Sequence, residues 1–189
     1  DWYDYNEKRW ANAKSADGSY WVWIPRYAYK ITSGYHSSTT GTIDVKFLKS
    51  TLNIASDNTF VETTGYEAHV KDTSMHHFLH PAFQFNGDEL GFWVAKFEPT
   101  AAEGIASGTS SCNSADDTTS KTVKILPGET SWRCINLANS FKLSLEMKNK
   151  TDVYGWLSHE LDAHMMTNHE WGAVAYLSTS NYGANTIIW

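Results

Sequence analysis

The chain contains three stretches in which the pattern of hydrophobic and polar positions predicts β-strands. Residues 20–31 are rich in aromatic and β-branched side chains, which favour extended structure. Pro25 has no backbone N–H to donate, so we expect this strand to lie at a sheet edge or to contain a bulge. Residues 42–48 alternate apolar with polar side chains, which is typical of a half-buried strand. Residues 91–98 are mostly apolar on both faces, which indicates a central strand.

A first amphipathic helix is predicted between residues 131 and 147. Its apolar side chains recur at intervals of three and four residues, at Ile135, Ala138, Phe141 and Leu145. This spacing puts the four side chains on one helix face, and we expect that face to pack against the core.

A second helix is predicted from its start signal. Thr167-Asn168-His169-Glu170 has the pattern of a capping box, in which the Thr167 hydroxyl accepts from the Glu170 backbone N–H and the Glu170 carboxylate accepts from the Thr167 N–H. We expect a helix of about ten residues, with one face formed by Trp171, Val174, Ala175 and Ser178, and a stop at Asn181-Tyr182-Gly183.

Together these elements predict an α+β fold of short antiparallel strands, two amphipathic helices and long loops. Residues 1–19 form an N-terminal aromatic segment, and residues 20–189 form the main domain. Within that domain, residues 99–124 are dominated by Ala, Gly, Ser, Thr and Asp, so we expect a flexible surface loop there.

Charge and hydropathy exclude several function classes. The 189-residue chain has 21 acidic and 15 basic side chains and a formal net charge of −6, so it lacks the clustered positive charge that nucleic-acid binding needs. No stretch approaches the roughly 18 apolar residues of a membrane-spanning helix, so no membrane insertion is expected. The chain begins at Asp1 without the features of a signal peptide, which suggests a processed chain or a fragment of a longer product.

Titratable groups do not form a recognisable catalytic or metal site in the sequence. His76, His77 and His80 lack the carboxylate of a zinc-protease motif, and Pro81 disfavours a helix running through them. A second group, from His159 to Glu170, is better explained by exposed side chains and helix capping. The chain contains no nucleophile elbow, phosphate-binding glycine loop or paired-cysteine zinc motif. We therefore predict no catalytic residue, no metal ligand and no cofactor.

Two cysteines, Cys112 and Cys134, are candidates for a disulfide. Pairing would close a loop of about 22 residues and stabilise the fold by about 3 kcal/mol in the chain-entropy model. The sequence leaves both the paired and the unpaired state open.

Three segments resemble a known family in the same order along the chain. Residues 167–176 resemble the T-x-x-E-W-x-x-A-A helix of the formylglycine-generating-enzyme or sulfatase-modifying-factor family, whose core is a variant of the C-type-lectin fold. Residues 91–100 resemble its F-W-V-G-K-F-E-x-T strand, and residues 127–141 resemble its P-x-x-S-W-x-x-I-x-x-x-F turn and helix. The resemblance covers residues 20–183 and is greatest to a bacterial and phage branch.

Departures from the family pattern decide what the resemblance implies about function. The chain stops at Trp189, before the calcium-binding and closing segments of full-length members, so the domain is short for this fold. Neither Cys112 nor Cys134 occupies the place of the enzymes' copper-binding cysteines. The resemblance therefore implies a non-catalytic module that is displayed on a virion (a phage tail or head decoration) or on an extracellular bacterial surface. Its expected partners are cell-surface carbohydrate or protein, copies of itself, or other structural subunits.

The resemblance also divides the tryptophans, of which the chain has 9 beside 10 Tyr and 8 Phe. Trp93, Trp132 and Trp171 fall on the matched elements and are expected in the core. Four others match no predicted element and are the candidate ligand contacts, since Trp stacks on sugar rings and is enriched at interfaces: Trp2, Trp10, Trp156 and Trp189.

Three further interpretations remain open from the sequence. One is a metal-dependent enzyme related to the sulfatase-modifying family, and the other is a subunit of an extended, pilus-like filament. A third is that the 189 residues are half of a domain completed by another chain.

Overall fold

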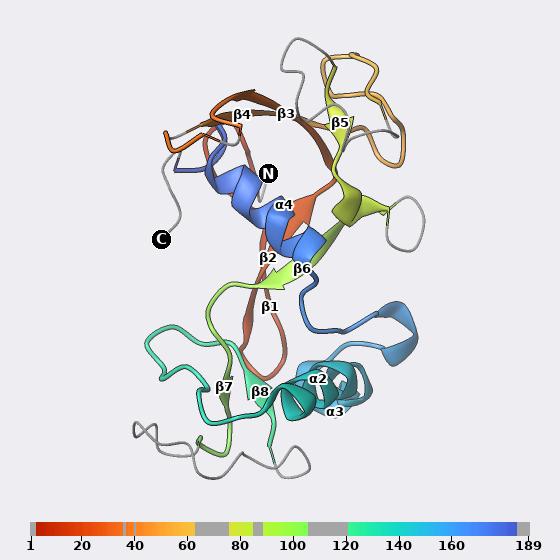
Figure 1. Ribbon diagram of the computed structural model, residues 1–189. Coiled ribbons are helices and arrows are strands. Elements are labelled where there is room, and N and C mark those ends of the chain that lie inside the picture. The colour runs from red at the N-terminus through yellow and green to blue at the C-terminus, as the bar shows by residue number, and fades with distance from the viewer. Residues whose placement is uncertain are drawn as a thin grey trace. The chain divides into compact units, whose positions relative to one another are not determined.

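The computed structural model describes residues 3–35, 37–39, 41–62, 76–84, 89–105 and 121–184. Its strands are β1 (Asn12–Lys14), β2 (Tyr20–Pro25), β3 (Tyr27–Ser33), β4 (Thr42–Phe47), β5 (Phe78–Leu79), β6 (Gly91–Ala95), β7 (Thr100–Ala101) and β8 (Val123–Lys124). Its α-helices are α2 (Leu137–Glu146), α3 (Thr151–Tyr154) and α4 (Asn168–Ser178), and its 3₁₀ turns are η1 (Pro81–Phe83), η2 (Met147–Asn149) and η3 (Ser158–Glu160). Small antiparallel sheets and few helices confirm the predicted α+β class (Figure 1).

The chain folds into two compact units, each assembled from separate segments. Unit 1 comprises Asp1–Ala11, Trp23–Phe92 and Thr167–Trp189, and unit 2 comprises Asn12–Val22 and Trp93–Met166. The sheets have the strand orders β1-β2-β6, β4-β3-β5 and β7-β8.

Two of the three predicted strands differ from expectation. Residues 20–31 form two strands, β2 and β3, which are separated at Arg26 after Pro25 ends the first. Residues 91–98 were expected to form a central strand, but β6 stands at the end of the order β1-β2-β6 among the described strands. Residues 42–47 form β4 as the alternation predicts, with Val45 buried.

Unit 1 is built around the sheet β4-β3-β5. Strands β3 and β4 pair antiparallel with Tyr27 opposite Phe47 and Tyr29 opposite Val45. Because directly opposite residues share a face, this register puts the aromatic side chains of β3 on one face. Helix α4 packs there (Figure 1): the Tyr27 hydroxyl donates to the Ala173 carbonyl at 2.7 Å, and the Tyr29 ring lies 5.0 Å from the Tyr176 ring.

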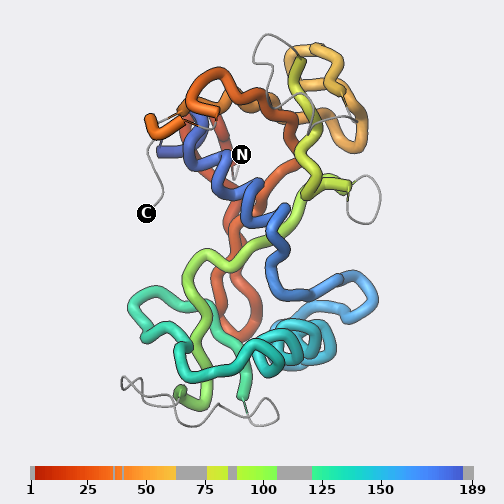
Figure 2. Tube along the Cα trace, in the orientation of Figure 1, coloured from red at the N-terminus to blue at the C-terminus, as the bar shows by residue number. Residues whose placement is uncertain are grey.

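The other face of this sheet is covered by the segment after β4. Ala55 and Val61 pack with Ala28 of β3 in a buried cluster, and Leu48 lies against it. The segment folds back on itself through bridges between Leu48 and Ala55 and between Ile54 and Phe60, as the orange-to-yellow part of Figure 2 shows. It is therefore an ordered cover of the sheet.

Helix α4 begins at the predicted capping box. The Thr167 side chain accepts from the Glu170 N–H at 3.3 Å, and the Glu170 carboxylate accepts from the Thr167 N–H at 2.7 Å. The prediction that Trp171 is a core residue is wrong, because its side chain is 61% exposed. The buried residues of α4 are Ala173 and Leu177, and Trp171 points away from their side of the helix.

Unit 2 is held together by a core of Val123, Ile125 and Leu143. Partly buried hydrophobic side chains that pack on it are Trp21, Ala95, Phe97, Trp132, Ile135 and Met147. The expected core place of Trp132 thus agrees with its packing, whereas Trp93 is exposed. The buried Tyr154 hydroxyl donates to the Val123 carbonyl at 2.9 Å and ties α3 to β8.

The predicted buried face of the first helix is wrong. Helix α2 starts after Asn136, whose side chain accepts from the Asn139 N–H at 2.8 Å, so Ile135 lies outside it. Its buried residue is Leu143, and Phe141 is 49% exposed. The three-and-four spacing marks an apolar stripe correctly, but the core lies against a different side of the helix.

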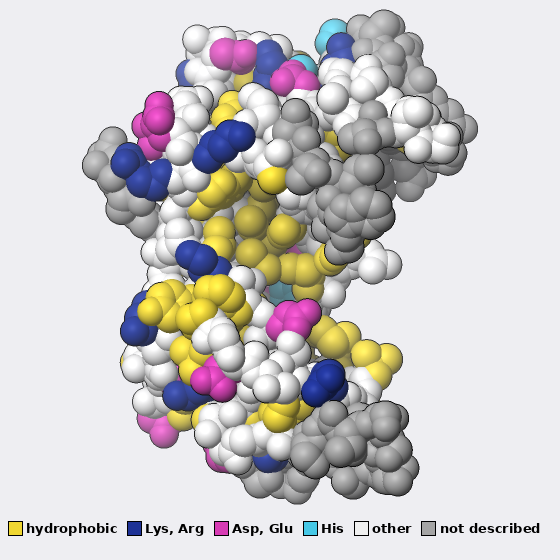
Figure 3. Space-filling model, turned by 90° about the vertical axis from the view of Figure 1, so that its left-hand side faces the viewer, with side chains coloured by type: hydrophobic (Ala, Val, Ile, Leu, Met, Phe, Trp, Pro, Cys, Tyr) yellow, Lys and Arg dark blue, Asp and Glu magenta, His cyan; other side chains and the backbone are white. Residues whose placement is uncertain are grey.

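Hydrophobic side chains reach the surface in both units, as the face drawn in Figure 3 illustrates. The large ones exposed in unit 1 are Tyr3, Leu52, Ile54, Phe60, Leu90 and Trp171. Those in unit 2 are Trp93, Leu137, Phe141, Leu157, Met165 and Met166.

Candidate functional site

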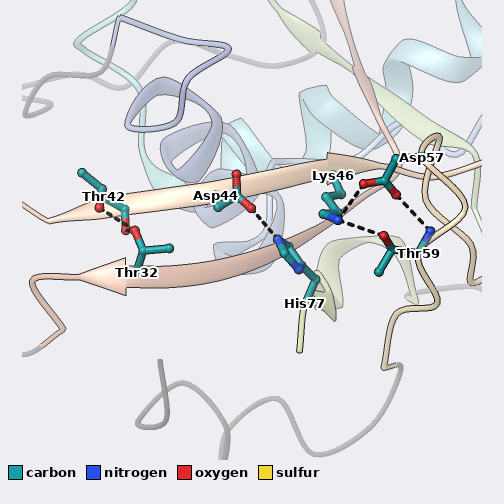
Figure 4. Close-up of polar contacts among 7 residues, drawn as sticks. All are labelled: Thr32, Thr42, Asp44, Lys46, Asp57, Thr59 and His77. Carbon is teal, nitrogen blue, oxygen red and sulfur yellow. Dashed lines mark hydrogen bonds and ion pairs between the residues drawn. The ribbon is translucent and has the colours of Figure 1, made fainter. Parts of the chain in front are cut away.

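Polar side chains follow one face of β4 in unit 1. The alternation that buries Val45 turns Thr42, Asp44 and Lys46 to the opposite side of the strand. Figure 4 shows each of them in a polar contact with a residue from another segment. We call this row of three residues the polar face of β4.

Asp44 is held by a histidine from a distant part of the chain. His77, which comes directly before β5, places its Nε2 atom 2.6 Å from Asp44 Oδ2 (Figure 4). The His77 side chain is 13% exposed and that of Asp44 is 47% exposed. The imidazole can donate from Nε2 both as the neutral tautomer and as the imidazolium. The contact therefore fixes one carboxylate oxygen of Asp44, and no described residue is shown bonded to the other.

Lys46 ties the polar face to the segment after β4. Its ammonium group lies 2.7 Å from Asp57 Oδ2 and donates to the Thr59 hydroxyl at 2.9 Å. The hydrogen bond from Lys46, followed by those from Thr59, holds the pKa of the Asp57 carboxyl well below its usual range. This exposed ion pair serves to position the segment and adds little to stability.

Thr42 marks the other end of the polar face. Its hydroxyl lies 2.5 Å from the Thr32 hydroxyl and 2.9 Å from the Ser33 hydroxyl of β3. The Thr42 N–H donates to Ser33 Oγ at 3.1 Å, where the β3–β4 register shifts. The shift turns several hydroxyl groups toward one spot at the edge of the sheet.

An open depression of about 400 Å³ lies along β4, lined by Thr32, Thr42, Ile43, Asp44 and Asn181. Asn181 comes from the turn that follows α4, where Ser180 bridges to Ile43. Ser180 is buried, donates to the Leu177 carbonyl at 2.7 Å and accepts from the Tyr182 N–H at 3.2 Å. The turn is thus fixed, and it places Asn181 in the lining of the depression.

Aromatic rings from the N-terminal segment and from β4 pack against this turn. The Phe47 ring lies 4.6 Å from both the Tyr5 and Tyr182 rings, and Tyr5 lies 5.0 Å from Trp10. Burial, with a smaller contribution from Tyr3, raises the pKa of Tyr5 to about 12. Burial also raises the pKa of Tyr182, and the carboxylates of Asp44 and Asp57 raise it further. Tyr182 is therefore within electrostatic reach of the carboxylate that lines the depression.

Two of the tryptophans expected at a ligand site, Trp10 and Trp156, are described by the structure, and neither lines this depression. Trp10 belongs to these aromatic rings, and Trp156 of unit 2 stacks on Tyr154 with ring centroids 4.3 Å apart and donates to the Met147 carbonyl at 3.2 Å. Trp2 and Trp189 lie outside the described residues. Cys134 is buried and disulfide-bonded, and Cys112 also lies outside the described residues.

Sequence reasoning missed the lining residues of the depression. Thr42, Asp44 and Lys46 were visible as the polar half of an alternating strand, and that alternation was the one available signal. Nothing local in the sequence connects Asp44 with His77 or with Asn181, because those contacts depend on the path of the chain.

His80 has a different role from its neighbour His77. It is buried among the rings of Tyr27, Tyr29, Phe83 and Tyr176, and its Nδ1 accepts from the Ala82 N–H at 3.2 Å. Burial, with a smaller contribution from His169, lowers the pKa of His80 to about 3. A neutral imidazole in this core is a packing group.

Within the described part of the chain, no three His, Cys, Asp or Glu side chains are grouped as metal ligands. The same residues contain no helix of the length and apolar character needed to cross a membrane.

Comparison of the chain with family models, with curated proteins and with solved structures gives no match.

Proposed function

We propose that the chain is a non-catalytic binding module that recognises carbohydrate at the depression along β4. The observation that carries the proposal is the lining itself, which brings together Thr32, Thr42, Ile43, Asp44 and Asn181. Supporting elements hold each of these groups, so the site is largely formed before a ligand arrives. Such preorganisation lowers the entropic cost of binding.

The chemistry of the lining fits a neutral, hydroxyl-rich ligand. A carboxylate accepts hydrogen bonds from sugar hydroxyls, and a carboxamide both accepts and donates. Asp44 uses one oxygen for His77 and keeps the second for a ligand. Ile43 adds an apolar residue to the lining. The negative charge of Asp44 disfavours acidic sugars by like-charge repulsion.

The setting of the module follows from its resemblance and forms part of the proposal. We place the chain in the non-enzymatic branch of the sulfatase-modifying-factor-like C-type-lectin fold, displayed on a virion or an extracellular bacterial surface. The observed α+β architecture with small antiparallel sheets is compatible with that fold. Binding residues there sit on loops and strand edges over a rigid scaffold, as Asn181 and Thr42 do here.

An array of neutral and acidic glycans probed with the labelled 189-residue chain tests the proposal. We expect binding to a subset of neutral glycans and at least about tenfold weaker binding by Asp44→Asn, equivalent to about 1.4 kcal/mol, because the amide cannot replace the carboxylate as a double acceptor. Lys46→Gln is the matched control, since Lys46 lies on the same face of β4 but does not line the depression.

Two results would contradict the proposal. One is the absence of glycan binding by folded chain. The other is glycan binding that Asp44→Asn leaves unchanged, because the ligand would then lie elsewhere on the molecule.

A further inference from the structure

Three neighbouring hydroxyl groups at the edge of the β4-β3-β5 sheet use their protons on one another (Figure 4). The Thr32 hydroxyl lies 3.1 Å from the Thr42 carbonyl oxygen, and in that contact the hydroxyl is the donor. Because its single proton is used there, the 2.5 Å contact between the Thr32 and Thr42 hydroxyls takes its proton from Thr42. The 2.9 Å contact between the Thr42 and Ser33 hydroxyls then takes its proton from Ser33. What these groups still offer to a ligand is therefore oxygen lone pairs.

Asp44 adds further acceptors and a negative charge to the same lining. An ionised carboxylate accepts hydrogen bonds and donates none. Its Oδ2 atom lies 2.6 Å from His77 Nε2, and its side chain is 47% exposed. The His77 imidazole can donate from Nε2 without carrying a charge. Asp44 can therefore keep its negative charge while His77 holds it in place.

The charges around the depression favour a cation over an anion. None of the residues that line it is basic. Lys46, the cation on the polar face of β4, is engaged by Asp57 and Thr59. Burial raises the pKa of Tyr182, and the carboxylates of Asp44 and Asp57 raise it further, so their negative field extends over the turn beside the depression. The chain as a whole has a net charge of −6, which also attracts cations.

We propose that the depression prefers a sugar that carries a free, protonated amino group, an inference that rests on the carbohydrate site proposed above. A primary ammonium has three N–H donors and no acceptor, so it matches a lining of lone pairs, whereas a sugar hydroxyl would leave its own lone pairs unpaired. Hydrogen bonds between an ionised donor and an ionised acceptor are also about twice as strong as neutral ones. Asn181, whose carboxamide has N–H donors, can pair with a neighbouring hydroxyl of the same sugar.

A matched set of tetrasaccharides tests the preference. They share one β-1,4-linked backbone and differ only at C2 of each ring, which carries an amino group, an N-acetylamino group or a hydroxyl group. Isothermal titration calorimetry of the 189-residue chain at neutral pH gives the three dissociation constants. We expect the amino form to bind at least about threefold more tightly than either of the others at low salt. That ratio should shrink as salt is added, because exposed charges are screened.

Two variants separate a contact with Asp44 from a general attraction to an acidic protein. Asp44→Asn should abolish the preference for the amino form. Asp57→Asn is the matched control, since it removes the same charge from a residue that does not line the depression, and it should retain the preference. A preference that survives in Asp44→Asn, or that is lost equally in Asp57→Asn, overturns the proposal. If Asp44→Asn fails to fold, the salt series on the unaltered chain decides, and a ratio that does not change with salt overturns the proposal.

Failure of this preference can be told apart from failure of the carbohydrate site. Binding of neutral glycans that depends on Asp44, together with equal or weaker binding of the amino form, overturns the amino-sugar preference and leaves the site in place. Absence of binding to any glycan overturns both. Binding of Nα-acetyl-lysine amide as tightly as the amino tetrasaccharide would assign the depression to a protein lysine, and would overturn the proposal of a sugar ligand.

Discussion

At the scale of single residues, the main finding is that two neighbouring histidines do opposite things. His77 contacts a carboxylate on the polar face of β4, while His80 is buried among aromatic rings. Their cluster was visible in the sequence, and its interpretation as non-metal histidines remains a prediction. Which of them is buried depends on the β3–β5 register, with Ala28 opposite Leu79 and Tyr29 opposite Phe78, and no local pattern encodes that register.

The burial of His80 predicts acid-sensitive stability. Its pKa is lowered by burial to about 3 in the folded chain, whereas that of an ordinary histidine is about 6.5. Below pH 6.5 the unfolded chain takes up a proton that the folded chain does not, so stability falls as the pH drops from about 6.5 toward 3. Uptake of one such proton changes the free energy of unfolding by about 1.4 kcal/mol per pH unit.

Urea unfolding between pH 7 and pH 4 measures this slope. We expect His80→Phe to reduce the loss of stability per pH unit by about one proton's worth, whatever its effect on stability at pH 7. His159→Asn, at an exposed histidine, is the matched control and should leave the slope nearly unchanged. An unaltered slope in His80→Phe would show that His80 is not the group responsible.

At the scale of elements, the sequence predicted where a helix begins better than it predicted which side of a helix is buried. The capping box located the beginning of α4 because it depends on four consecutive residues. The side that each helix buries depends on what packs against it, so the expectations for Trp171 and Phe141 were wrong. For the same reason, apolar residues on both faces of β6 did not make it a central strand.

The packing of α4 predicts that Gly172 can be replaced by alanine without a clash. A Cβ atom built there would lie 3.7 Å from His80 Nε2, which is an ordinary van der Waals distance. Gly172→Ala should therefore raise the free energy of unfolding by up to about 1 kcal/mol, because Ala has the higher helix propensity. Thermal or urea denaturation measures the change.

Gly91 at the start of β6 provides the opposite case. Its φ is +149°, and a Cβ atom there would collide with the Ile24 carbonyl oxygen and with the Trp23 ring, whose nearest atom is at 2.7 Å. Gly91→Ala should therefore be clearly destabilising in the same assay. Equal changes in the free energy of unfolding for Gly172→Ala and Gly91→Ala would contradict this packing.

At the scale of the whole molecule, the chain forms two compact units from discontinuous segments. Hydrophobic periodicity predicts strands and helices one at a time, and it contains no information about which distant segments join. The candidate site illustrates this, because Asp44, His77 and Asn181 come from three separate parts of unit 1. The α+β class could be predicted from the sequence, and the site could not.

The disulfide pairing of Cys112 with Cys134 remains a prediction at this scale. Cys134 is disulfide-bonded, and the chain has two cysteines. Peptide mapping without reductant should recover one linked pair containing both, and reduction should lower the free energy of unfolding by about 3 kcal/mol. Two reactive thiols in the folded, unreduced chain would contradict the pairing.

The central claim is that the depression along β4 holds a carbohydrate. Titration of the isotope-labelled chain with a glycan selected on the array, followed by the amide resonances in NMR spectra, tests it most directly. We predict chemical-shift changes concentrated at Thr32, Thr42, Ile43, Asp44 and Asn181. Changes centred instead on Trp10 or Trp156, with those five residues unaffected, would contradict it.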